Sequence, residues 1–133
     1  MVAVDANVPL RIIVGDDARQ CDIALALIAS NGIYLLPTVV LEVEWVLRSR
    51  YKFDRRRIAD ALAALFALPG VDIERRIAVE WAIGRYKVRG EFADLLHLAC
   101  VPVTVDAFAT FDAGIAKDAG TTSPVVVRTL ASA

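Results

Sequence analysis

The chain has 133 residues and a net charge of −1, a balance that by itself favours no class of partner. Hydrophobic residues make up 57% of it, above the roughly 45–50% typical of soluble domains. No apolar run approaches the ~18 residues of a membrane helix, and no signal peptide is recognisable at the start. We therefore expect one cytoplasmic domain over residues 1–133, which buries its apolar excess in a core and against another chain. Cys21 and Cys100 lie in apolar, helical surroundings, so reduced thiols are expected rather than a disulfide or a zinc site.

In the first half of the chain, short apolar runs alternate with helical periodicity. The predicted elements are a strand over 1–4, a segment over 8–14 with Pro9 in its first helical turn, a helix from Asp17 to Ser30, a strand over 33–36, and helices over 38–50 and 54–68. The expected helix caps are Asn7, Asp16 or Asp17, Thr38 and Asp54. The expected buried stripes are Cys21, Ala24, Leu25 and Ile28 in the helix from Asp17, and Ile58, Leu62, Leu65 and Phe66 in the helix from Asp54.

The second half continues the alternation. The predicted elements are an edge strand over 71–74, a helix over 75–89 with Ile77, Trp81 and Ile83 facing inward, a helix over 92–100, a strand within 103–111, a helix over 112–117 capped by Asp112, and a strand over 124–128. Strands that alternate with helices predict an α/β fold, with a parallel sheet covered by helices on both faces. Right-handed crossovers bring the carboxyl ends of parallel strands to one edge, where ligands bind.

Four carboxylates are placed to meet at such an edge. Asp5 and Asp112 each follow a predicted strand, Glu42 lies about one turn into the helix after the second strand, and Asp94 lies in the first turn of its helix. Four acids that close would repel one another unless a divalent cation neutralised them, and oxygen ligands favour Mg²⁺ or Mn²⁺. Such a metal orients a phosphodiester and activates water for attack.

Each acid also has an ordinary explanation when it is considered alone. Asp5 is a turn former, Asp112 a helix cap, and Asp94 a favourable charge at a helix N-terminus. Glu42 is harder to explain, because a carboxylate in so apolar a helix needs a partner and Glu44 is expected to be the solvated acid of that helix.

Two neighbours of these acids are also notable. His97 is the only histidine and lies one turn after Asp94, so a histidine metal cluster is excluded; we expect it to be packed or hydrogen-bonded rather than a catalytic base. Thr110, two residues before Asp112, is either a residue that supports this acid or an ordinary strand threonine.

Basic residues are concentrated in the middle of the chain. Of 15 Lys and Arg, 11 fall in one zone: Arg48, Arg50, Lys52, Arg55, Arg56, Arg57, Arg75, Arg76, Arg85, Lys87 and Arg89. The residues of this zone either contact the phosphate backbone of a nucleic acid or lie on solvated helix faces.

Several enzyme classes do not fit the sequence. A haloacid-dehalogenase phosphatase needs a second Asp at position 7, where this chain has Asn7. No Gly-x-Ser-x-Gly elbow, P-loop or dinucleotide-binding glycine pattern is present.

The four acids lie in motifs that resemble those of the PIN-domain ribonucleases, and among them the VapC-type toxins of toxin–antitoxin pairs. The matching motifs are residues 4–8 (VDANV), 41–47 (LEVEWVL), 92–99 (FADLLHLA) and 110–112 (TFD), in the family's order and roughly its spacing. The resemblance implies a three-layer α/β/α sandwich with a central, mostly parallel sheet of about five strands. It also implies that Asp5, Glu42, Asp94 and Asp112 are the acidic quartet.

The resemblance further implies Mg²⁺- or Mn²⁺-dependent endoribonuclease activity, a homodimer, and a VapB-type antitoxin that occludes the site. Asn7 and Thr110 are expected to support the acids, and the residues expected to contact RNA are Arg48, Arg50, Lys52, Arg55 and Arg85. The chain departs from many relatives at Glu91, where they have Asp, and at 113–114, where they often have a basic residue. The alternative is a PIN-like module that binds RNA or protein without turnover, although the intact quartet argues against it.

Apolar surface supports the expected assembly. The helix from Asp17 is apolar on more than one face, through Ile23, Ala26 and Leu27, and Trp45 is a large anchor of the kind that interfaces favour. We therefore expect a homodimer and a second apolar groove for a helical antitoxin segment.

Overall fold

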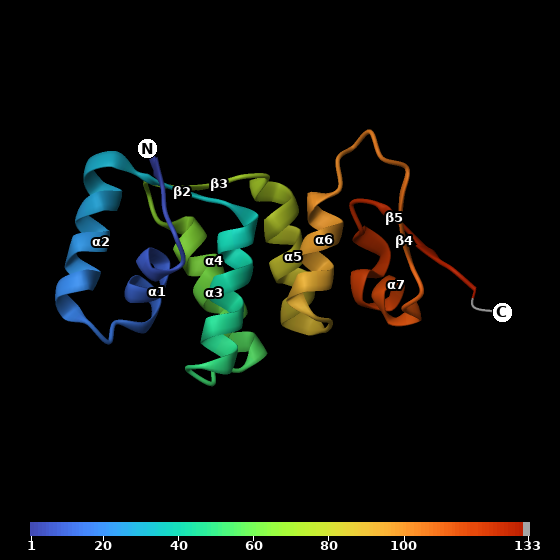
Figure 1. The fold of residues 1–133 in the computed structure, drawn as a ribbon, viewed down its shortest axis with the longest axis horizontal. Coiled ribbons are helices and arrows are strands. Elements are labelled where there is room, and N and C mark those ends of the chain that lie inside the picture. Colours follow the sequence, from blue (N-terminus) through green and yellow to red (C-terminus); the bar gives the residue numbers. More distant parts are fainter. Residues whose placement is uncertain (132–133) are drawn as a thin grey trace. The chain divides into compact units, whose positions relative to one another are not determined.

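The computed structural model describes residues 1–131, which fall into two compact units. Unit 1 is Met1–Arg76, and unit 2 is Ile77–Ala133, described as far as residue 131 (Figure 1). Each unit contains helices and parallel strands, which confirms the predicted α/β class. No helix within residues 1–131 is both long and apolar enough to span a membrane.

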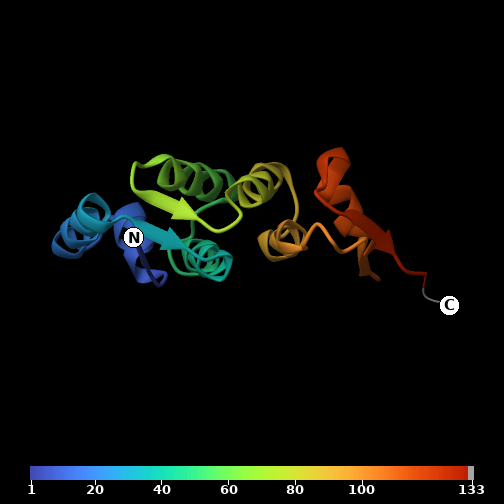
Figure 2. The same cartoon turned by 90° about the horizontal axis from the view of Figure 1, so that it is seen from above.

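Unit 1 is built on a three-stranded parallel sheet. Its elements are β1 (Val2–Ala3), α1 (Asn7–Val14), α2 (Ala18–Asn31), β2 (Ile33–Leu35), α3 (Pro37–Ser49), α4 (Arg55–Ala67) and β3 (Val71–Ile73). The strand order is β1-β2-β3, with Ile33 of β2 paired to Val2 on one side and to Val71 on the other. Figure 2 shows β2 and β3 side by side. Two helices connect each pair of successive strands, because parallel neighbours need long crossovers.

Both the sheet and the helices of unit 1 contribute buried apolar side chains. These are Ile33 and Leu35 from β2, Val71 and Ile73 from β3, Leu10 from α1, Val40, Val43 and Leu47 from α3, and Ile58, Leu62, Leu65 and Phe66 from α4. The stripe predicted for α4 is thereby confirmed. At the edge of this core Gly70 has φ +87°, and a Cβ there would lie 2.9 Å from the carbonyl oxygen of Ile28. Only glycine allows β3 to start this close to α2.

Unit 2 contains a second parallel sheet of two strands. Its elements are α5 (Arg76–Val88, of which the first residue belongs to unit 1), α6 (Phe92–Cys100), β4 (Ala107–Thr110), α7 (Ala113–Ala119), a 3₁₀ turn η1 (Gly120–Thr122) and β5 (Val126–Thr129). The register pairs Ala107 with Val126 and Thr110 with Thr129. A core cluster of Leu98, Ile115, Ala119 and Val125 joins the helices to this sheet. The five predicted strands are therefore all present, and each is parallel to its neighbours in its own sheet, three strands in one unit and two in the other.

Three of the predicted helix caps are confirmed and two are wrong. The carboxylates of Asp17, Asp54 and Asp112 accept backbone N–H groups of α2, α4 and α7 respectively. Asn7 is instead the first residue of α1, and Ala6 precedes it. Thr38 lies inside α3, because Pro37 occupies the first helical turn, where its missing N–H costs nothing.

Two predicted core residues are also wrong. Ile77 is 87% exposed, whereas α5 buries Val79, Ala82, Ile83 and Tyr86. Two residues correspond to about 200° around a helix, so Ile77 lies opposite Val79. Leu25 of α2 is exposed for a similar reason, because the buried face passes through Ala24 and Ile28.

Candidate functional site

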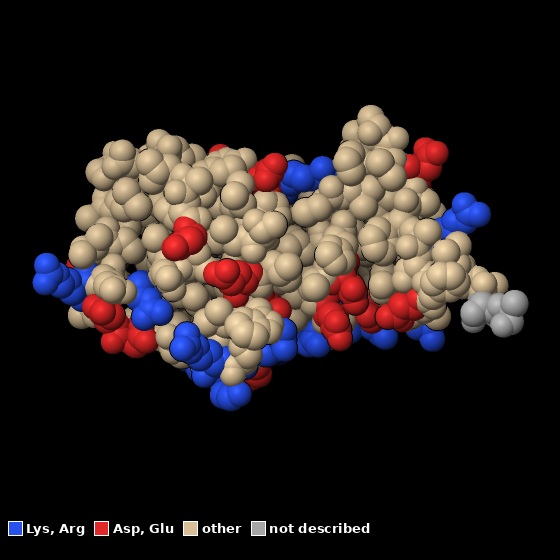
Figure 3. All heavy atoms as spheres, viewed as in Figure 1, with Lys and Arg blue, Asp and Glu red and all other residues tan. Residues whose placement is uncertain are grey.

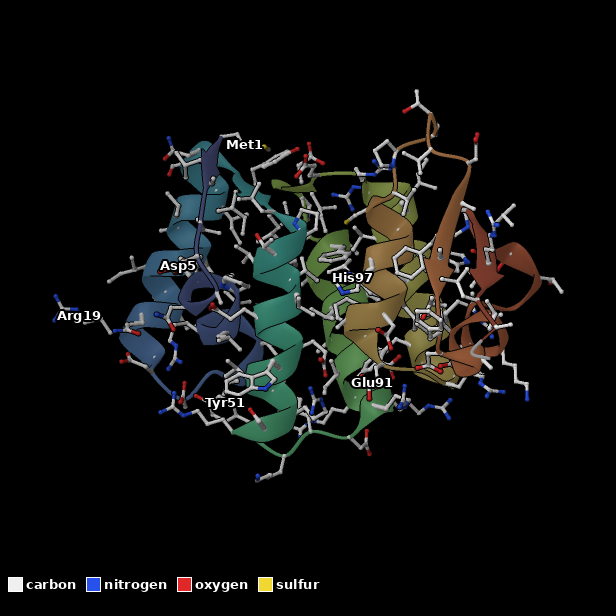
Figure 4. All side chains as sticks on the ribbon, turned by 45° about the vertical axis from the view of Figure 1, so that its right-hand side comes forward. Met1, Asp5, Arg19, Tyr51, Glu91 and His97 are labelled. Atoms are coloured by element: carbon white, nitrogen blue, oxygen red, sulfur yellow. The ribbon has the colours of Figure 1, made fainter. Side chains whose placement is uncertain are left out.

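Asp5 and Asp112 occupy equivalent local positions, one in each unit. Each lies two residues beyond the last residue of a parallel strand and just before a helix. The Oδ1 atom of Asp5 accepts the Asn7 N–H at 3.2 Å, and Oδ1 of Asp112 accepts the Gly114 N–H at 2.8 Å. Each carboxylate is thus fixed by the backbone two residues further on, as in an Asx turn. Both side chains are exposed, and Figure 4 shows Asp5 where β1 leads into α1.

Thr110 supports Asp112 directly. Its Oγ1 accepts the Asp112 N–H at 3.0 Å, which orients the backbone from which the carboxylate projects. Asn7 contributes its backbone N–H to Asp5 rather than a side-chain cap. The two residues therefore contact the two acids in different ways.

On α3 the structure reverses the expected roles of the two glutamates. Glu42 is exposed, and Glu44 is only 3% exposed. The carboxylate of Glu44 accepts from Arg48 one turn later, with Nε at 2.7 Å and Nη2 at 3.4 Å. The expectation that Glu44 is the solvated acid is wrong, because helical geometry turns it to the same side as the buried Val40, Val43 and Leu47.

Asp94 and His97 lie one turn apart on α6. Asp94 is half-buried in the first turn, and within the described part of the chain its carboxylate has no hydrogen bond or ion pair. His97 is exposed in the last turn (Figure 4). The expectation that His97 is packed is wrong, because the buried face of α6 passes through Leu95, Leu98 and Ala99.

The donor chemistry of the four acids fits a hard divalent cation. All four provide carboxylate oxygens, and among residues 1–131 Glu42 and the Oδ2 atoms of Asp5 and Asp112 have no hydrogen-bond partner. Oxygen donors of this kind favour Mg²⁺ or Mn²⁺. Asp5 and Glu42 belong to unit 1, and Asp94 and Asp112 to unit 2. Among residues 1–131, no group of three or more Asp, Glu, His or Cys side chains is placed to hold a metal ion, so the structure does not bring the four acids together as predicted.

The basic residues expected to contact RNA have different surroundings. Arg48 is paired with Glu44, and Arg50 is exposed at the end of α3. Lys52 has φ +59° and donates from Nζ to the Ser49 carbonyl at 2.7 Å. In unit 2, Nε of the half-buried Arg85 donates to a backbone carbonyl of α7.

The turn between α3 and α4 is nevertheless strongly basic. Arg55, Arg56 and Arg57 all lie in the first turn of α4, where cations oppose the helix dipole. Asp54 offsets part of this by capping the helix, and Arg57 lies 3.6 Å from the ring centroid of Phe53. Figure 3 shows Lys and Arg gathered at the lower ends of α3 and α4.

Two networks were not predicted from the sequence. In unit 1, the carboxylate of Asp16 accepts from Arg11 at 2.8 Å and from the Tyr51 hydroxyl at 3.0 Å. In unit 2, Asp118 accepts from Arg85 and Arg89. Both join residues about 30 positions apart or more, so no local sequence signal identifies them.

A groove of about 520 Å³ lies between α1 and α2. Its lining combines apolar and polar residues, namely Asn7, Val8, Arg11, Gln20, Ile23, Ala24 and Leu27. Ile23 is 59% exposed, and Leu25 and Trp45 are also exposed large hydrophobic residues of unit 1. Helices α2 and α3 therefore carry apolar surface that no other part of residues 1–131 covers.

Comparison with known proteins gives one match. The PIN domain family matches residues 2–120, a range that includes all four acids and crosses the boundary between the units. No curated protein sequence matches the chain, and no solved structure does either. The PIN domain is generally a metal-dependent nuclease fold, and this chain belongs to the PIN domain family.

Proposed function

We propose that this protein is a Mg²⁺- or Mn²⁺-dependent endoribonuclease that acts as the VapC-type toxin of a toxin–antitoxin pair. The observation that carries the proposal is the matched setting of Asp5 and Asp112. Each follows a parallel strand, and each has one carboxylate oxygen fixed by a backbone N–H while the other has no partner among the described residues. The family match over residues 2–120 supports a single PIN domain made of both units.

The four acids have distinct roles in this proposal. Asp5 and Asp112 hold the metal most directly, and Glu42 and Asp94 bind it directly or through water. When bound, the metal polarises a phosphodiester and supplies an activated water. Thr110 holds the backbone of Asp112 in position through its hydroxyl, and Asn7 does the same for the Asp5 carboxylate through its N–H.

Calorimetric titration with Mn²⁺ tests the metal site. Wild-type protein should bind Mn²⁺ and cut single-stranded RNA, and Asp5→Asn should bind Mn²⁺ more weakly and cut slowly. Asp17→Asn is the matched control, because Asp17 also accepts a backbone N–H but caps α2. Equal Mn²⁺ affinity in wild type and Asp5→Asn would remove Asp5 from the site. RNA binding without any cleavage in Mn²⁺ would favour a binding module without turnover.

The basic turn between α3 and α4 is the proposed contact for the RNA backbone. Arg50 and Lys52 are exposed there, beside the three arginines at the start of α4. RNA affinity should fall with salt by roughly 0.7 log units per log unit for each phosphate contacted. Replacing Arg50 or Lys52 by Ala should each lower that slope, measured by RNA binding in EDTA. Arg19→Ala, an exposed arginine on α2, should leave the slope unchanged; equal effects at all three positions would indicate solvated helix faces.

We propose that the protein is located in the cytoplasm and that it forms a homodimer in the absence of its antitoxin. The exposed Trp45 supports the homodimer, since interfaces use large apolar anchors. Sedimentation at tens of micromolar (roughly where a micromolar dimer persists) should show a dimer that Trp45→Asp weakens. Val103→Asp is the control, at an apolar residue that is 96% exposed in unit 2. A wild-type monomer at this concentration would refute the dimer.

We propose that the groove between α1 and α2 is the binding site of a helical VapB-type antitoxin segment. Its lining from Val8 to Leu27 is largely apolar, and Asn7 at its start is two residues from Asp5. An antitoxin arginine could therefore pair with a carboxylate of the site. Mn²⁺ titration of the purified complex tests this point. Undiminished binding would show that the partner covers the groove without entering the site.

A further inference from the structure

The C-terminal end of α7 is held by the last turn of α5 and the residue after it. Nε of Arg85 donates to the Asp118 carbonyl oxygen at 2.8 Å, and Nε of Arg89 donates to Asp118 Oδ1 at 2.8 Å. The first bond satisfies one of the carbonyls that a helix leaves without a partner at its end. The second is an ion pair in which the side chains of Arg89 and Asp118 are 52% and 21% exposed. Asp118 of α7 thus accepts hydrogen bonds from two arginines.

Two glycines allow this close contact. Gly90 has φ +96°, and a Cβ there would lie 2.9 Å from the Cβ of Asp118. Gly120 has φ +68°, and a Cβ there would lie 2.9 Å from Cζ of Arg85. A Cβ at Gly90 would push Asp118 away, whereas a Cβ at Gly120 would displace the flexible end of the Arg85 side chain from its bond. The contact between the end of α5 and the end of α7 is therefore built into the backbone as well as into the side chains.

The position of α7 depends on this contact in addition to the core cluster of Ile115 and Ala119 with Leu98 and Val125, because the helix is short. It has seven residues and buries only Ile115 and Ala119. An isolated helix of this length is unstable in water, so its ends must be held by other parts of the chain. The N-terminal end is held by Asp112, which caps it through Gly114. Any displacement of α7 along its axis therefore moves the Asp112 carboxylate.

We propose that Arg85 and Arg89 are positioning residues, which hold α7 through Asp118 so that the Asp112 carboxylate is fixed for its ligand. The inference rests on the proposed function, in which Asp112 binds the metal. It replaces the expectation that Arg85 contacts RNA, because the half-buried guanidinium already donates to the chain itself. The two arginines act through Asp118 and do not touch the substrate.

The first experiment measures hydrogen exchange of the Gly114 amide, which reports directly on the Asp112 cap. Arg85→Ala should speed this exchange by about tenfold, the equivalent of one charge-assisted hydrogen bond, and Arg89→Ala by about threefold, because its ion pair is half-exposed. Arg128→Ala, an exposed arginine on β5 of the same unit, is the control and should leave the exchange unchanged. Asp118→Ala removes the carboxylate that accepts from Arg89 and should speed the exchange as Arg89→Ala does, which keeps the test available if that arginine variant fails to fold.

The second experiment combines Mn²⁺ and RNA titrations of the same variants. Arg85→Ala should weaken Mn²⁺ binding severalfold and leave the salt slope of RNA binding in EDTA unchanged. Arg89→Lys, which keeps the cation beside Asp118, should recover most of the Mn²⁺ affinity that Arg89→Ala loses. A lower salt slope in Arg85→Ala with normal Gly114 exchange would overturn the inference and restore Arg85 as an RNA contact. If wild type binds no Mn²⁺, the proposed function fails, while Gly114 exchange still decides whether the arginines hold Asp112.

Discussion

Asp112 has two roles that a pair of substitutions can separate. Its Oδ1 caps α7 by accepting the Gly114 N–H at 2.8 Å, and its Oδ2 is the proposed metal ligand. Asn keeps a cap oxygen and loses the charge, whereas Ala loses both. An N-cap is worth about 1 kcal/mol of unfolding free energy and Asn caps about as well as Asp. We expect Asp112→Ala to cost about 1 kcal/mol, or a fall in Tm of about 3–5 °C for a chain of this size.

Asp112→Asn should cost less than about 0.5 kcal/mol, since the exposed carboxylate loses only its interaction with the helix dipole. Both variants should bind Mn²⁺ weakly. Thermal unfolding and Mn²⁺ calorimetry, run on the same preparations, measure the two effects. Asp17→Asn and Asp17→Ala form the matched control pair, with the same stability pattern in α2 and unchanged Mn²⁺ binding. If Asp112→Asn binds Mn²⁺ like wild type, Asp112 is a cap only, and the reasoning is refuted.

Five further substitutions test the packing within the two units by chemical denaturation. Gly70→Ala should lower the free energy of unfolding by about 1–3 kcal/mol, because φ is +87° and the new Cβ would lie 2.9 Å from a backbone oxygen of α2. Gly84→Ala in α5 is the control: a Cβ there meets no described atom within 4 Å, so the free energy of unfolding should rise by about 0.5–1 kcal/mol. Leu62→Ala should lower the free energy of unfolding by about 2–5 kcal/mol, since Leu62 is fully buried. Ile77→Ala should leave it nearly unchanged, because the Ile77 side chain is 87% exposed. Similar losses at both sites would contradict the assigned faces of α4 and α5. Tyr51→Phe should cost about 1 kcal/mol through the lost hydrogen bonds of its hydroxyl, and unchanged stability would show that this contact is weak in solution.

Local chemistry along the chain was enough to predict most elements. Asp17, Asp54 and Asp112 mark the starts of α2, α4 and α7 because a carboxylate followed by helical periodicity is a local signal. The stripe from Ile58 to Phe66 is buried as its period predicts. Pro37 misled the prediction, because proline fits the first turn of a helix as well as the end of a strand.

For the candidate site, the sequence could predict only the local surroundings of single residues. The sequence places Asp5 and Asp112 after strands, and the structure finds each of them two residues beyond one. The contact between the Thr110 hydroxyl and the Asp112 N–H spans two residues. These features are local, because the chain between the partners is too short to allow many other arrangements.

Tertiary structure decided what local pattern could not. Glu42 and Glu44 are two residues apart in one helix, and only the packing of α3 shows that Glu44 is buried with Arg48 while Glu42 is exposed. The hydrogen bonds that Asp118 accepts from Arg85 and Arg89 likewise join residues about 30 positions apart. The physical reason is that periodicity defines which residues share a face, whereas burial depends on which face another part of the chain covers.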